Sequence, residues 1–81
     1  MSTETIYEGP AHNATFYVPS GGGIVRFRFS DQRASGYMRS RDGSLFRAQP
    51  GARLFLPAGQ HVLTLYDPEL MARVSITFEP L

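Results

Sequence analysis

The sequence contains no cysteine, no tryptophan and no lysine among its 81 residues. The lack of cysteine excludes a disulfide framework, a thiolate metal site and a cysteine nucleophile. Apolar runs reach only three or four residues, far short of the roughly 20 that a membrane helix needs, so we expect no membrane insertion. The N-terminus, Met-Ser-Thr-Glu-Thr, lacks the basic start and the apolar stretch of a secretory signal. We therefore expect either a cytoplasmic protein or a periplasmic domain of a longer, exported chain.

The composition is typical of one folded domain. Hydrophobic residues make up 42% of the chain and charged residues 19%, which provides enough apolar surface to offset the loss of chain entropy on folding. A chain of this length forms a single domain, residues 1–81. The formal net charge is +1, too small for the strong electrostatic field of a dedicated nucleic-acid binder.

Apolar and polar residues alternate along the chain, and no window shows the three-four spacing of a helix. For example, Val25, Phe27 and Phe29 alternate with Arg26 and Arg28. The pattern predicts about seven short strands, near 5–8, 14–18, 24–30, 36–41, 44–48 with 53–56, 61–66 and 72–79. Their apolar positions predict a core of Phe16, Val18, Val25, Phe27, Phe29, Leu54, Leu63, Leu65, Val74, Ile76 and Phe78.

Turn-forming residues separate these strands at short intervals. Asp42 and Gly43 suit a tight hairpin turn, since both central positions of that turn need positive φ. Such a turn would join 36–41 to 44–48, and the Pro57-Ala58-Gly59 turn would precede the strand at 61–66. Seven strands without helices indicate an all-β single domain, a β-sandwich or a small barrel.

The order of motifs in the second half resembles a known family. The order is Asp42-Gly43, Leu45, Pro50-Gly51, Leu54-Phe55-Leu56-Pro57 and Gly59-x-His61-x-Leu63-Thr64-Leu65-x-Asp67. It resembles the C-terminal, immunoglobulin-like domain of bacterial penicillin-binding proteins of the 1C type. Ile6, Pro10-Ala11 and Ala14-Thr15-Phe16 are similar to the opening strand of that family, so the resemblance spans nearly the whole chain. The two tryptophans typical of the family are missing. The resemblance implies a small immunoglobulin-like β-sandwich that is a non-catalytic appendage of a periplasmic cell-wall enzyme.

Histidine and carboxylate positions do not suggest catalysis or metal binding. His61 follows a turn at the start of a strand. There a ring nitrogen can form a hydrogen bond with a nearby loop backbone and hold that turn in place. We therefore assign structural roles to His61, Asp42, Gly43 and Gly59. The two histidines lie 49 positions apart without a flanking carboxylate pair, which is no zinc signature. No nucleophile elbow or phosphate loop is present, so we predict no catalytic residue, no metal site and no cofactor.

The arginines are the residues that suggest a binding surface. Arg26 and Arg28 share a face of the strand at 24–30. Arg39 and Arg41 share a face of the strand at 36–41, together with Tyr37. If these two strands pair with matching faces, their arginines and one tyrosine form an exposed patch that can hold carboxylates or phosphates. A solvated outer sheet face accounts for the same residues. The candidate binding residues are Arg26, Arg28, Tyr37, Arg39, Arg41 and Arg47, with Arg53 as a possible extension.

These observations favour a non-catalytic binding or accessory module that contacts a protein partner or an envelope polymer. The alternative is a free-standing small binding protein, such as an inhibitor or a phage decoration or virion protein. A single-strand nucleic-acid binder that uses an arginine–tyrosine face ranks third, because the net charge is small.

Overall fold

The computed structural model describes residues 3–39, 43–49, 51–67 and 69–81, which form eight strands. Short runs of alternating apolar and polar residues form strands such as those at 14–18 and 23–29, and a turn rich in glycine separates these two. The strands are β1 (Glu4–Pro10), β2 (Ala14–Val18), β3 (Gly23–Phe29), β4 (Gly36–Arg39), β5 (Leu45–Ala48), β6 (Arg53–Leu56), β7 (Gly59–Leu65) and β8 (Arg73–Pro80).

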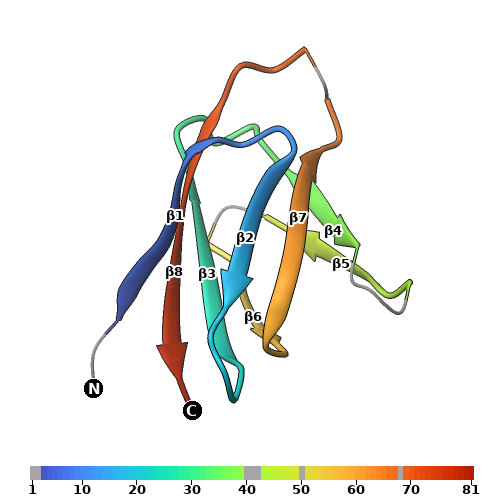
Figure 1. Cartoon of the computed structure of the whole chain (residues 1–81). Helices are drawn as coiled ribbons and strands as arrows, with labels where there is room; N and C mark the ends of the chain where they lie inside the picture. The colour runs from blue at the N-terminus through green and yellow to red at the C-terminus, as the bar shows by residue number, and fades with distance from the viewer. Residues whose placement is uncertain (1–2, 40–42, 50, 68) are drawn as a thin grey trace.

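Two antiparallel four-stranded sheets make up the fold (Figure 1). Sheet A has the strand order β1-β8-β3-β6, and sheet B has the order β2-β7-β4-β5. Among these strands only the β4–β5 connection stays within one sheet, and every other connection joins strands of opposite sheets. Two interleaved four-stranded sheets of this order form a jelly roll.

The all-β sandwich that the sequence predicts is confirmed, but the strand order and number differ from the expectation. In an immunoglobulin domain the first two strands pair in one sheet, whereas β1 and β2 lie in opposite sheets here. The segments predicted at 44–48 and 53–56, counted together in the prediction, contain two strands in different sheets, so the described residues form eight strands rather than about seven.

The hairpin predicted around 42–43 exists as a strand pair but has another register. β4 and β5 pair antiparallel with Arg39 opposite Leu45, whereas a two-residue turn at 42–43 would place Phe46 opposite Arg39. Gly43 has a φ of +90°, in the region that favours glycine. Asp42, the other residue of the predicted turn, lies outside the described residues.

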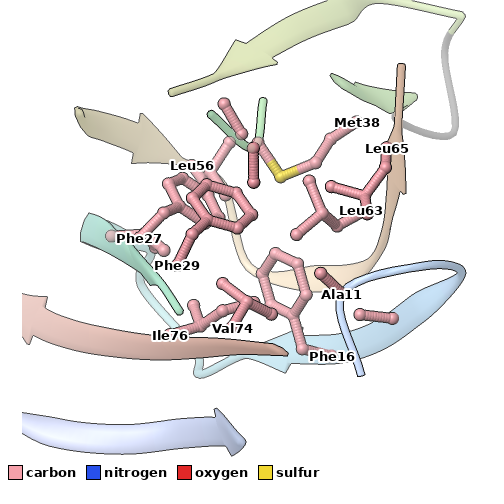
Figure 2. Packing of buried hydrophobic residues seen from close by; sticks show 14 of the residues in the cluster. Ala11, Phe16, Phe27, Phe29, Met38, Leu56, Leu63, Leu65, Val74 and Ile76 are labelled. Atoms are coloured by element: carbon pink, nitrogen blue, oxygen red, sulfur yellow. The ribbon is translucent and has the colours of Figure 1, made fainter. Parts of the chain in front are cut away.

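The core fills the space between the two sheets (Figure 2). Of the eleven predicted core residues, ten are buried; the exception, Leu54, is half-buried and packs against the others. Phe16 of sheet B meets Phe27 of sheet A edge to face, with ring centroids 6.4 Å apart. Leu56 and Met38 are fully buried as well, although the sequence did not single them out.

A glycine is required where β3 begins between β6 and β8. A Cβ on Gly23 would lie 2.4 Å from the carbonyl oxygen of Glu79 and 2.7 Å from the ring of Phe78. The preceding turn has Gly21 and Gly22 at φ +96° and +71°, and the N–H of Gly22 donates to the carbonyl of Pro19. These glycines let the chain cross from β2 to β3 in a short, close-packed loop.

Two phenylalanines of sheet A test the assignment of its faces. Phe27 points into the core and is 2% exposed, whereas Phe55 is 50% exposed. Phe27→Ala should lower the free energy of unfolding by about 3–5 kcal/mol, because it leaves a cavity. Phe55→Ala, the matched control, should lower it by about 0.5 kcal/mol or less. Urea denaturation followed by circular dichroism measures both, and equal losses would contradict the assigned faces.

Candidate functional site

The predicted arginine patch is divided between two opposite surfaces of the sandwich. β3 pairs with β8 and β6, and β4 pairs with β7 and β5, so the strands that were expected to pair lie in different sheets. The single patch is therefore not formed. Arg26 and Arg28 are on the outer face of sheet A, while Tyr37, Arg39 and Arg47 are on the outer face of sheet B. Arg41 lies outside the described residues.

Sheet A brings a third arginine beside the first two. Arg53 of β6 lies directly opposite Arg26 of β3, and Thr77 of β8 lies opposite Arg26 on the other side. Directly opposite residues share a face of the sheet, and all three arginines are exposed. We call Arg26, Arg28 and Arg53 the arginine face.

The arginine face borders a shallow hollow of about 520 Å³. The register aligns Thr5, Thr77, Arg26 and Arg53 in one row across the four strands, and Ser75 lies opposite Arg28 in the next row. The hollow is thus lined by guanidinium and hydroxyl groups, and no carboxylate is among its described lining residues. Its lining consists of Thr3, Thr5, Arg26, Phe27, Arg28, Gly51, Arg53, Ser75 and Thr77.

The arginines of the arginine face form no ion pair within the described part of the chain, although Glu8 and Glu79 lie on the same outer face of sheet A. Among the described residues, the ion pair that forms is between Arg33 and Asp31, in the loop after β3, and none involves Arg26, Arg28 or Arg53. Like charges directly opposite each other across a strand pair are destabilising. Arg26 and Arg53 place two like charges opposite each other across the β3–β6 pair.

The Asp31–Arg33 pair has a structural explanation. The carboxylate of Asp31 accepts the backbone N–H of Arg33 at 2.9 Å and a guanidinium N–H at 2.8 Å, which closes the turn after β3. The hydrogen bond from the Arg33 side chain is the main cause that lowers the pKa of Asp31 to about 2. Asp67 similarly accepts the backbone N–H of Glu69 at 3.0 Å in the loop after β7. Both aspartates thus form turns.

The outer face of sheet B carries aromatic rings beside its arginines. Tyr37 lies opposite Arg47 on β5, and its ring lies 5.1 Å from the ring of Tyr66 at an angle of 46°. Arg39, two residues along β4 from Tyr37, lies opposite Leu45, which is 59% exposed. This second surface keeps three of the predicted residues together, but it lacks the opposed charges of the arginine face.

His61 lies inside the sandwich, where β7 begins. The residue is 3% exposed, and its ring stacks on that of Phe16 with the centroids 5.7 Å apart. Nε2 donates to the carbonyl oxygen of Pro57 at 3.0 Å. This contact of a ring nitrogen with a loop backbone is the one predicted from the position of His61 after a turn. Nδ1 is buried without a hydrogen-bond partner. Gly59, between Pro57 and His61, has a φ of +126° and allows the turn.

The hydroxyl groups of Thr5, Ser75 and Thr77 were not recognised from the sequence. They follow the polar alternation of the first and last strands, but only the pairing of β1 and β3 with β8 brings them to the arginines. The described residues contain no group of three histidine, aspartate or glutamate side chains placed to hold a metal ion. Nor does the described part of the chain contain a helix long and apolar enough to cross a membrane.

Comparisons with protein-family models, curated proteins and solved structures find no match to this chain. The resemblance to the penicillin-binding protein domain therefore stays a prediction based on the motifs quoted above.

The pKa of Asp31 tests the turn after β3. Because its folded-state pKa of about 2 is below the ordinary 3.8, the pair stabilises the fold above about pH 4, and that contribution is lost as the pH falls toward 2. Arg33→Gln should raise the Asp31 pKa toward 3.8, as measured by carboxyl ¹³C NMR. Arg47→Gln, the control, should leave it unchanged. A pKa that stays near 2 in Arg33→Gln would contradict the assigned cause.

Two variants separate the packing of His61 from its hydrogen bond. His61→Phe keeps a ring against Phe16 but loses the bond to Pro57, and should lower the free energy of unfolding by about 1–2 kcal/mol. His61→Ala also leaves a cavity and should lower it by about 3–4 kcal/mol. Urea denaturation measures both. A Phe variant as stable as the native protein would remove the bond to Pro57 as a stabilising interaction.

Proposed function

We propose that this domain is a non-catalytic binding module that holds an anionic partner on its arginine face. One observation carries the proposal: Arg26 and Arg53 lie directly opposite each other beside a hollow with hydroxyl groups and no carboxylate among its described lining. A protein that only needed a solvated sheet face would gain stability from opposite charges at these two positions.

The chemistry of the face suits carboxylates and phosphates. A guanidinium group donates two parallel hydrogen bonds to either anion, and the hydroxyls of Thr77 and Ser75 add donors in the same two rows. Neighbouring strands are about 4.8 Å apart, and residues two apart on one strand are about 6.6 Å apart. Long arginine side chains at this spacing can reach the same anionic group or two adjacent ones.

A protein partner with acidic side chains fits better than nucleic acid. The net charge of the chain is +1, so it lacks the long-range field that draws a protein to a polyphosphate. The proposal applies equally to an accessory domain of a cell-wall synthase and to a free-standing binding protein. In both settings the arginine face binds the partner, and no catalytic group is needed.

Two double variants with the same change in net charge test the proposal. Arg26→Gln with Arg53→Gln should weaken the binding of polyglutamate at least tenfold, measured by ¹⁵N NMR titration at low salt. Arg39→Gln with Arg47→Gln, on the opposite sheet, should weaken it less than twofold. The first variant should also melt at a slightly higher temperature at low salt, because like-charge repulsion is removed.

Two results would contradict the proposal. An equal loss in both double variants would mean that binding follows the net charge and not the face. Tighter binding to a single-stranded oligonucleotide than to polyglutamate, with a steep dependence on salt, would favour the nucleic-acid alternative instead.

A further inference from the structure

β6 is an open edge of sheet A next to the arginine face. It is the last strand of the sheet and pairs with β3 alone, from Arg53 opposite Arg26 to Leu56 opposite Gly23. In an antiparallel pair, the N–H and C=O groups of alternate residues point away from the partner strand. In the described part of the chain no strand takes up those groups of β6, so its backbone can pair with another chain.

The other edge of sheet A is less available. β1 lies against β2, so the two sheets approach each other closely on that side. β1 also carries a register irregularity between Thr5 and Tyr7, and such bulges disturb an edge as a template for pairing. β5 and β6, at the opposite side of the sandwich, approach each other much less.

The core is incompletely covered where β6 lies. Leu54 points inward, opposite the fully buried Val25, yet it is only half-buried. Phe46 of β5 points inward opposite Met38 and is half-buried too. An additional strand along β6 would cover Leu54 and extend the core.

The outer face of β6 indicates which side chains a partner strand would carry. Arg53 is exposed beside Arg26, and two residues further Phe55 lies opposite Ile24 and is 50% exposed. A strand paired with β6 would place one side chain beside Arg53 and another beside Phe55 on the same face. Charge complementarity requires an acidic residue at the first position, and apolar contact favours a hydrophobic residue at the second.

We propose that the anionic partner is an extended segment of another protein that adds to sheet A as an antiparallel strand along β6. In the order of its sequence, the segment has three apolar residues, opposite Leu56, Phe55 and Leu54, followed by an acidic residue opposite Arg53. This inference rests on the proposed function, because the acidic residue binds the arginine face. Backbone hydrogen bonds provide affinity, and the alternate side chains provide specificity.

The charge of the edge disfavours a second copy of this chain as the occupant. If two β6 strands paired antiparallel, the two sheets would join, and the positive charges of Arg53 and Arg26 from both copies would lie close to the new strand pair. β6 itself contains no acidic residue to neutralise them.

A peptide experiment tests the proposal. The probe is the blocked peptide Thr-Val-Ile-Val-Glu-Asn, and the control peptide has Lys in place of Glu. The probe should bind, slow amide hydrogen exchange in β6 at least tenfold, and shift the side-chain Nε–H signals of the three arginines. Methylation of alternate backbone nitrogens of the probe should weaken binding at least tenfold.

Charge exchange locates the contact. Arg53→Glu should weaken binding of the Glu peptide at least tenfold and strengthen binding of the Lys peptide by a similar factor. The matched control is Arg47→Glu on β5, which should change neither by more than twofold. The reciprocal gain with the Lys peptide shows that the variant is folded and that the two charges meet.

Each other outcome overturns a defined part of the proposal. Binding that shifts the arginine signals without protecting β6, and that tolerates methylation, would overturn the added strand but leave the proposed function intact. Failure of both the peptide and polyglutamate to bind would overturn both. Concentration-dependent protection of β6 without peptide would overturn the assigned occupant and identify a second copy.

Discussion

The burial of one face of β3 determines the rest of the structure. Val25, Phe27 and Phe29 all point into the space between the sheets, so Arg26 and Arg28 must point to the solvent. A slip of one residue would place both guanidinium groups in the core and expose the apolar side chains. Because β3 lies between β8 and β6, the same register also determines which residues meet the arginines.

This constraint gives the two outer surfaces different characters. Sheet A places hydroxyl groups on β1 and β8 and positive charge on β3 and β6. Sheet B places the Tyr37–Tyr66 pair beside the arginines of β4 and β5. Each surface is thus defined by the polar side chains of the four strands that its own sheet brings together.

Local alternation predicted the strands and their buried faces, but it could not predict which strands pair. Alternation at 24–30 shows that Arg26 faces the solvent, since it depends only on neighbouring residues. Whether Arg39 or Arg53 lies beside Arg26 depends on sheet order, which is a non-local property. In the same way, Leu54 and Leu56 both face inward, as the alternation predicts. Leu54 is half-buried and Leu56 is fully buried, and this difference depends on the strands around them.

An arginine on an edge strand also protects the protein against aggregation, because charges at sheet edges discourage pairing with another chain. Protection against aggregation explains why β6 is short, why it carries Arg53 and why Pro57 follows its last residue. It does not explain why the neighbour of Arg53 on β3 is another arginine, since an acidic residue there would leave the edge charged and remove the repulsion. Nor does it account for Leu54, an inward apolar side chain that the fold leaves half-covered at the same edge. A bound strand with an acidic residue accounts for both features, because it neutralises the opposed arginines and covers the leucine.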